Sequence, residues 1–281
     1  MKFKIVRLTP IPIALIIISL IGIFLVYSKS GDLFLKDIDL KGGTSLTLIF
    51  NESLPIEKIE PIIKQKLDSF IISSSKTIEG YTSIKILSEK NVNASEIIAF
   101  LNSNGIYPIE HSLEFVGPEL GNVFFSQVSL LLTVAYFLLF LITLYIYKRF
   151  IISITIIFSS LMNILAVFGI MNLLNQKISF AGFSSLLMLI AFTIDSNVLL
   201  ATKVFSAKAE EFYEQYKKGL ITCLTTDLGL IISMMIVLIL TNSPFLINIA
   251  QIQIIGFISD ILNTWILNAA MLEVIMLGKR H

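Results

Sequence analysis

Long apolar stretches alternate with short polar segments along most of this chain of 281 residues. A helix needs about 20 mostly apolar residues to cross the hydrocarbon core of a membrane. Six stretches are apolar enough over that length, at residues 10–27, 123–147, 150–173, 178–202, 219–241 and 247–277. The pattern therefore predicts an α-helical polytopic membrane protein with six transmembrane helices.

Composition agrees with this prediction. Hydrophobic residues make up 55% of the chain and charged residues 15%, which is more apolar surface than a soluble domain can bury. The net charge of +1 gives no reason to expect a nucleic-acid partner. The single cysteine, Cys223, lies in an apolar stretch, where we expect it to pack as a small hydrophobic side chain.

Basic residues are distributed asymmetrically around the predicted helices. One side of the membrane receives eleven of them: Lys2, Lys4, Arg7, Lys148, Arg149, Lys203, Lys208, Lys217, Lys218, Lys279 and Arg280. The short loops on the other side carry Lys177 alone. Because Lys and Arg are enriched in short cytoplasmic loops, we predict that both termini are cytoplasmic and that residues 28–122 are extracytoplasmic.

The first apolar stretch also has features of a secretory signal peptide. Basic residues precede it, and Ser28-Lys29-Ser30 is a weak cleavage sequence. However, the Pro10–Tyr27 run is longer than a usual signal core, and its removal would place the C-terminus against the charge distribution. We therefore expect the segment to be retained as the first helix.

The polar region between the first two helices is predicted to be a compact α+β domain. Its expected elements are a strand at Ile38–Phe50, a helix at Pro55–Phe70, a hairpin of Ile71–Ile78 and Tyr81–Leu87, a helix at Ser95–Leu101 and a strand at Tyr107–Val116. The order βαββαβ is typical of the ferredoxin-like fold. The chain thus divides into residues 1–27, 28–122 and 123–281.

Three short segments resemble the SecD/SecF protein-export family, a branch of the resistance-nodulation-division (RND) exporters. They are Asp37–Thr44 before the outer domain, Val116–Gly121 before the second helix, and Ile194–Leu200 in the fourth helix. The positions that carry the first two motifs are Asp39, Gly42, Gly43, Thr44, Gly117, Pro118 and Gly121. The helix order and the place of the outer domain also agree with that family.

The resemblance implies half of an RND fold and a role in protein export. The small outer domain and Thr44 favour the SecF form, whereas Asp195-Ser196-Asn197 is closer to the SecD form of its motif. This combination suits an archaeal-type member. The implied partners are SecD, a SecY-type channel, the translocating polypeptide and membrane lipid, and no cofactor is implied.

Carboxylates inside the predicted helices are candidate functional groups. Asp195, Asp227 and Asp260 lie within apolar stretches, and Glu273 lies near the cytoplasmic end of the last one. A charged side chain at mid-bilayer costs about 2.5–3.5 kcal/mol on insertion scales, so each needs a compensating role. By resemblance, Asp195 matches the family's helix 4 aspartate, which is implicated in proton-driven function. We expect Asp195 to be buried between helices.

Other residues support this hypothesis to different degrees. By resemblance, Lys218 is the basic residue that opens the fifth helix, where the bacterial pattern has Arg. Asp227 and Asp260 are additions to that pattern, and we treat both as further proton-coupling candidates. Polar residues expected to assist are Asn197, Thr225, Thr226 and Asn263.

Small and polar residues also form stripes on three helices. The fifth helix has Thr222, Thr225, Thr226, Gly229 and Ser233, with Asp227 off this stripe; the sixth has Gln253, Gly256, Asp260, Asn263 and Thr264; the fourth has Gly182, Ser185, Asp195, Ser196 and Thr202. Such residues pack helices closely. We expect these polar sides to face lipid unless a partner, above all helix 4 of SecD, covers them.

Three other functions fit the sequence less well. An aspartyl protease would need a Gly-x-Gly-Asp segment, which precedes neither Asp195 nor Asp260, and we find no nucleotide loop, metal cluster or nucleophile motif. We therefore do not expect an enzyme. A half-sized RND exporter of lipids or small molecules would normally need a larger outer domain. A passive assembly subunit would predict that Asp195 is dispensable.

Overall fold

A computed structural model describes residues 5–51, 56–67, 70–76, 81–88, 92–116, 118–206, 208–241 and 243–277. The chain separates into two compact units. The helical unit comprises residues 1–35, 129–239 and 248–281, and the sheet unit comprises residues 36–128 and 240–247. We describe each unit by itself.

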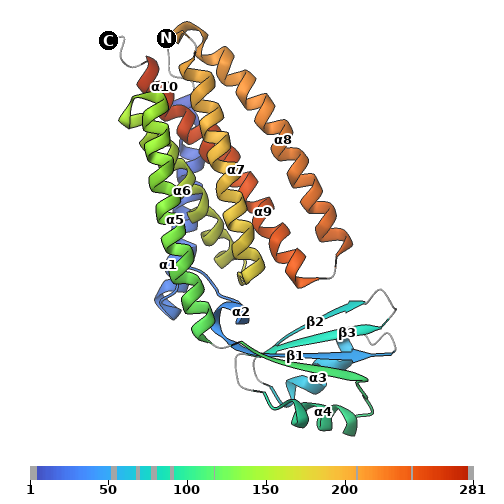
Figure 1. Ribbon diagram of the computed structural model, residues 1–281. Coiled ribbons are helices and arrows are strands. Elements are labelled where there is room, and N and C mark those ends of the chain that lie inside the picture. The colour runs from blue at the N-terminus through green and yellow to red at the C-terminus, as the bar shows by residue number, and fades with distance from the viewer. Residues whose placement is uncertain are drawn as a thin grey trace. The chain divides into compact units, whose positions relative to one another are not determined.

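The six predicted membrane helices are confirmed. Among the described residues, six helical segments are long and apolar enough to cross a membrane. These segments lie in η1 (Ile5–Leu8) with α1 (Pro10–Ser30), in α5 (Pro118–Tyr147), α6 (Phe150–Leu173), α7 (Phe180–Phe205) and α8 (Phe212–Leu240), and in a last span built from α9 (Pro244–Leu262), η3 (Asn263–Asn268) and α10 (Ala269–Leu277) (Figure 1). A short η2 (Ala209–Glu211) precedes α8.

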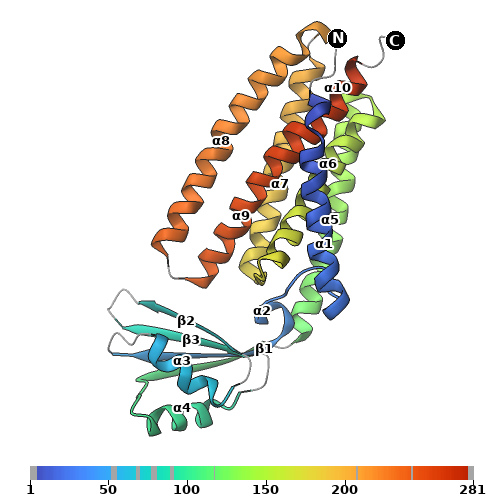
Figure 2. The ribbon, with the colours of Figure 1, turned by 180° about the vertical axis from the view of Figure 1, so that it is seen from behind.

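The sheet unit has the predicted βαββαβ order. Its elements are β1 (Gly43–Phe50), α3 (Ile56–Lys64), β2 (Phe70–Lys76), β3 (Thr82–Ser88), α4 (Ala94–Ser103) and β4 (Glu110–Val116). The four strands lie in the order β2-β3-β1-β4, and all neighbours are antiparallel. Helices α3 and α4 cover one face (Figure 2), where Leu48 and Ile84 of the sheet lie in one buried cluster with Ile59 of α3 and Leu101 of α4. The ferredoxin-like arrangement is confirmed.

The start of the first strand was predicted incorrectly. Residues Ile38–Lys41 form a short helix, α2, and β1 begins only at Gly43. Gly42 separates the two elements with a φ of +88°, a left-handed conformation that glycine adopts without steric cost. Thr44 follows, and its hydroxyl oxygen accepts a hydrogen bond from the backbone N–H of Val92 at 3.3 Å. This part of the family motif therefore shapes the entry into the sheet.

The remaining positions of the first two motifs are Asp39, Gly117, Pro118 and Gly121. The side chain of Asp39 and all of Gly117 lie outside the described residues. Pro118 and Gly121 lie at the beginning of α5, where proline is compatible with the first helical turn.

Helices α1 and α6 cross at very short range (Figure 2). A Cβ atom added to Gly169 would lie 2.2 Å from the backbone oxygen of Ser19, and one added to Gly22 would lie 2.3 Å from the backbone oxygen of Gly169. The Ser19 hydroxyl donates to the carbonyl of Leu15 at 2.8 Å. Small residues are what allow membrane helices to approach this closely.

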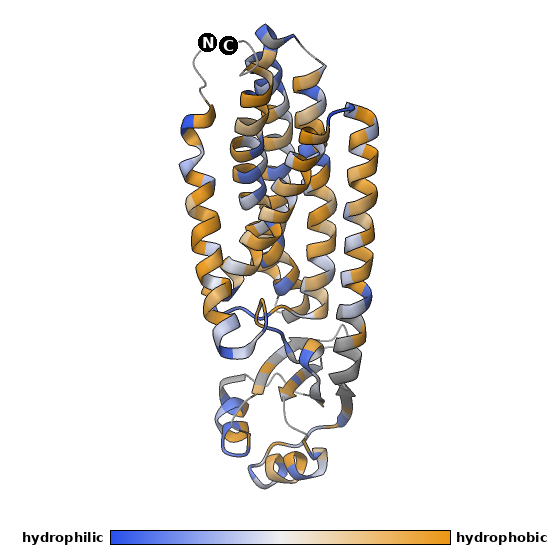
Figure 3. Cartoon of the chain, turned by 90° about the vertical axis from the view of Figure 1, so that its left-hand side faces the viewer, coloured by the Kyte–Doolittle hydropathy of each residue, from blue (hydrophilic) through white to orange (hydrophobic). Residues whose placement is uncertain are grey.

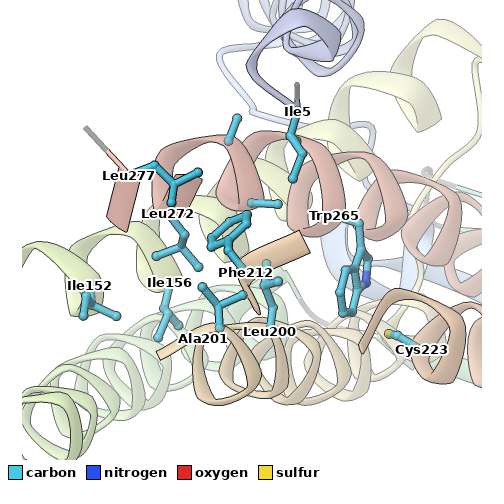
Figure 4. Close-up of a cluster of buried hydrophobic side chains, with 13 residues drawn as sticks. Ile5, Ile152, Ile156, Leu200, Ala201, Phe212, Cys223, Trp265, Leu272 and Leu277 are labelled. Atoms are coloured by element: carbon cyan, nitrogen blue, oxygen red, sulfur yellow. The ribbon is translucent and has the colours of Figure 1, made fainter. Parts of the chain in front are cut away.

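Both described chain ends, Ile5 and Leu277, belong to one buried hydrophobic core of the helical unit (Figure 4). Ile5, Phe212, Trp265 and Leu277 pack there with their neighbours from α6 and α7. Within the last span, the buried carboxylate of Glu273 accepts hydrogen bonds from the backbone N–H groups of Ile5, at 2.9 Å, and Val6, at 3.1 Å, and from the Tyr213 hydroxyl. Glu273 therefore caps the first helical segment.

Replacement of Gly169 by alanine should destabilise the protein. The added methyl group meets the backbone of α1, and overpacking of this kind costs about 1–3 kcal/mol. Gly229→Ala is the matched control, because no heavy atom lies within 4 Å of its added Cβ. That change should preserve or raise stability, since alanine favours a helix over glycine by about 1 kcal/mol. Thermal unfolding in detergent measures both, and equal midpoints for the two variants would contradict this packing.

Candidate polar site in the helical unit

Asp195 lies on the exposed side of α7. It shares that side with Leu187, Met188 and Phe192, all of which are exposed. The buried side of α7 carries Leu189, Thr193, Ser196, Asn197 and Leu200. One residue turns a helix by about 100°, so Asp195 points away from this buried side although Ser196 belongs to it. Our prediction that Asp195 is buried between helices is therefore wrong for this chain alone.

Lys218 is not brought to Asp195. Its ammonium group pairs with Glu214, one turn earlier on α8, with an Nζ–Oε1 distance of 2.7 Å. Both side chains are more than half exposed, at 58% and 64%. Because both groups are exposed to solvent, screening leaves the pair little effect on stability. Lys218 thus has a local partner on its own helix.

The side of α8 that holds Asp227 was predicted correctly. Asp227 is buried, and the Cys223 thiol donates to its Oδ2 atom at 3.3 Å. The sulfur of Cys223 also lies 3.3 Å from the Ser196 hydroxyl on α7. Cys223 is buried as expected, but it also joins two polar side chains, which the reading of Cys223 as a small hydrophobic residue missed.

The predicted threonine stripe of α8 lies on the opposite, exposed side. The hydroxyls of Thr222, Thr225, Thr226 and Ser233 each donate to the carbonyl four residues earlier in the helix. Their hydrogen-bonding donors are therefore satisfied without any neighbouring helix. Thr225 and Thr226 do not contact Asp195 through these hydroxyls.

The polar face of the last span is buried inside the subunit, not exposed to lipid. Asp260 on α9 is 1% exposed, and its Oδ1 atom accepts a hydrogen bond from the Thr264 hydroxyl at 2.8 Å. The Thr264 hydroxyl in turn accepts from the Asn197 amide on α7 at 2.9 Å. Nearer the start of α9, the Gln253 amide donates to the Ser185 hydroxyl of α7 at 2.9 Å. Polar groups thus hold α7 and α9 together, and no partner is needed to cover this face.

The network continues from Asn197 in two directions. Its amide nitrogen also donates to the carbonyl of Thr193 at 2.8 Å, and its amide oxygen accepts from Asn268 at 2.5 Å. From α6, the amide nitrogen of Asn163 donates to the Thr193 hydroxyl at 2.7 Å. Hydrophilic positions therefore interrupt the apolar helices within the bundle (Figure 3). The network links α6, α7 and the last span.

A π-helix interrupts the last span at Asn263–Asn268. Its wider hydrogen-bonding pattern leaves backbone carbonyls without their usual partners, and π-bulges occur frequently at functional sites. Here the Tyr216 hydroxyl of α8 donates to the carbonyl of Trp265 at 2.8 Å. Asn263, the first residue of the π-helix, is fully buried.

Sequence reasoning missed Asn163, Thr193 and Asn268 as members of this network. Asn163 offered a signal, since it is an amide side chain within a helix of 24 mostly apolar residues. Thr193 offered none, because threonines are common in membrane helices. Among the described residues, no group of three His, Cys, Asp or Glu is close enough to hold a metal ion.

Substitution of Asn197 by alanine should destabilise the subunit. It removes hydrogen bonds to Thr264 and Asn268, and such bonds in membrane proteins contribute about 0.6 kcal/mol each on average. Unfolding in detergent should therefore show a loss of about 1–2 kcal/mol. Thr225→Ala, which deletes an exposed hydroxyl with an intrahelical partner, should change stability much less. A comparable loss in both variants would argue against the network.

Comparison with known proteins identifies the family. The family model described as "Protein export membrane protein SecD/SecF, C-terminal" matches residues 99–278. The protein-export membrane protein SecF of Methanocaldococcus jannaschii is 30% identical, over 94% of this chain and 93% of the relative. SecF of Pyrococcus furiosus is 26% identical, over 96% of this chain and 90% of the relative.

Solved structures share the fold. The crystal structure of SecDF from Thermus thermophilus matches with a TM-score of 0.71 at 16% identity and covers 98% of this chain. SecDF in its super-membrane-facing form matches with a TM-score of 0.66 at 14% identity. This chain spans only 38% and 39% of those two SecDF chains. With most of its length inside the family match, the chain belongs to the SecD/SecF family of protein-export membrane proteins.

Proposed function

We propose that this chain is the SecF-like subunit of a protein-export complex and that it works together with SecD. The observation that carries this proposal is that relatives named SecF match the chain over nearly its whole length. The solved SecDF chains are more than twice as long as this chain, which covers 38–39% of them. A second, SecD-like chain would supply the remaining half of such an assembly.

The exposed side of α7 supports a partner helix. Asp195 lies there among exposed Met188 and Phe192, and a carboxylate facing lipid at this depth costs about 2.5–3.5 kcal/mol. Helices α5 and α8 are also mostly uncovered within this chain. A SecD helix packed on α7 would remove Asp195 from lipid, while the remaining apolar surface would contact membrane lipid.

Coupling to the proton gradient belongs to the same proposal. An aspartate at a helix–helix interface can bind a proton in one packing and release it in another. Asp195 fits this role because it would lie between the two subunits, whereas Lys218 is occupied by Glu214. The SecY-type channel and the translocating polypeptide would be the further partners of the assembled complex.

The first test is co-purification from native membranes combined with Asp195→Asn. SecD should co-purify with the wild-type chain and with the variant, because asparagine keeps the shape of the side chain. Export driven by the proton gradient should fall several-fold in the variant, because asparagine cannot titrate. The two measurements separate assembly from coupling.

Each alternative predicts a different pattern. A passive assembly subunit would retain SecD and lose no export in Asp195→Asn. A half-sized exporter of lipids or small molecules would purify without SecD or the SecY channel. Absence of SecD from the purified wild-type complex would therefore refute the proposed function.

We also propose that both termini are cytoplasmic and that the predicted 28–122 domain is extracytoplasmic. The eleven basic residues on the side of the termini, against Lys177 on the other, support this orientation. In a background with Cys223 replaced by serine, a cysteine at Ser83 should react with an impermeant thiol reagent from outside. A cysteine at Ser206, between α7 and α8, should react only after permeabilisation. The reverse pattern would invert the topology.

A further inference from the structure

We propose that residues Leu33–Leu35, called the strap below, form a latch that limits how far the strand-bearing segment of the chain can move from the helices. Asn172 of α6 is the central residue of this latch. The strap is the last part of the first helical stretch before the sheet unit begins at Lys36. The proposal does not rest on the export function or on the orientation of the chain in the membrane.

The Asn172 side chain binds the strap through both of its polar atoms. Its Oδ1 atom accepts a hydrogen bond from the backbone N–H of Leu35 at 3.1 Å, and its Nδ2 atom donates to the backbone carbonyl of Leu33 at 3.0 Å. A side-chain amide offers an acceptor and a donor side by side, so it can satisfy backbone groups as a neighbouring strand would. Because Asn172 lies in the last turn of α6, these bonds tie the strap to that helix.

The residue between the two hydrogen bonds packs against both α6 and α7. Phe34 is 6% exposed, and its ring stacks on Phe168 of α6 with the centroids 4.7 Å apart. Its centroid also lies 6.0 Å from that of Phe183 on α7. Such aromatic pairs add to the stability gained from burial alone. The carbonyl of Leu35 then accepts from the backbone N–H of Ile178, just before α7, at 2.8 Å. The strap is therefore held by two helices at once.

The latch shortens the connection between the helices and the strands. Helix α1 ends at Ser30, and Gly31 caps it with a φ of +74°, a left-handed conformation in which the chain leaves the helix axis. With the strap bound, the connection to β1 starts after Leu35; with the strap released, it would start at Gly31. The five residues regained would extend the connection by at most about 17 Å.

The strand-bearing segment joins the helices at a second place, where α5 begins at Pro118 soon after β4 ends at Val116. A body held at two fixed points turns only about the line between them, whereas a body held at one point turns freely around it. Release of the strap would thus remove one of two restraints. Because its partners are divided between α6 and α7, a change in the packing of these two helices would break one set of contacts and open the latch.

The test measures the distance between the two units in the full-length chain, in lipid nanodiscs and with Cys223 replaced by serine. Spin labels at Ser103 on α4 and Ser184 on α7, both exposed, report this distance. Asn172→Leu should broaden the distance distribution by up to about 17 Å, because leucine cannot hydrogen-bond to the strap. Gln176→Ala, which removes an exposed amide from the connection between α6 and α7, is the matched control and should leave the distribution unchanged. An unbroadened distribution in Asn172→Leu, or equal broadening in the control, would refute the latch.

A second variant tests the strap without altering the helices. Phe34→Ala removes the ring packed against α6 and α7, leaves Asn172 in place, and should also broaden the distribution. Hydrogen exchange separates release of the strap from loss of the bundle, since local opening exposes only nearby amides. The backbone N–H groups of Leu35 and Ile178 should exchange faster in both variants, while that of Ala166, buried within α6, stays protected. Equal loss of protection at Ala166 would show that these residues hold the bundle itself together, and the proposal would be wrong.

Discussion

The helical unit depends on one constraint, namely that polar side chains inside a membrane bundle must find partners in the protein. The hydrogen bond from Asn197 to Thr264 meets this constraint for two helices at once, because it joins α7 to the π-helix of the last span. From this bond the network reaches Asp260 on one side and Asn268 on the other. Water cannot replace lost partners easily in hydrocarbon, so the relative rotation of α7 and α9 is set largely by these contacts.

Two carboxylates of this subunit thus have opposite environments. Asp260 is buried and accepts a hydrogen bond from the Thr264 hydroxyl of the same chain, whereas Asp195 is exposed. The inner group therefore has a hydrogen-bonding partner within this one chain. The outer group is exposed on the same chain.

The sequence predicted the spans and the order of the sheet elements well, because both follow from local patterns of apolar residues. It also placed Asp227 correctly off the threonine stripe. It failed for Asp195, because small and polar residues occur on both sides of α7 and periodicity alone cannot tell which side packs inward. The π-helix was equally hidden, since no residue type specifies it and its carbonyl partner, Tyr216, comes from another helix. The start of β1 was missed because Ile38–Lys41 are compatible with either a strand or a helical turn.

The cap formed by Glu273 has a consequence for biosynthesis. The amide groups that it satisfies, at Ile5 and Val6, precede it by 268 and 267 positions in the chain. During synthesis the first membrane helix emerges long before this carboxylate exists, so its leading turn remains uncapped until the last span has been inserted. This contact therefore joins the segment that is synthesised first to the span that is synthesised last. A chain that ends before α10 would lack Glu273, so the backbone N–H groups of Ile5 and Val6 would lose their hydrogen-bond acceptor.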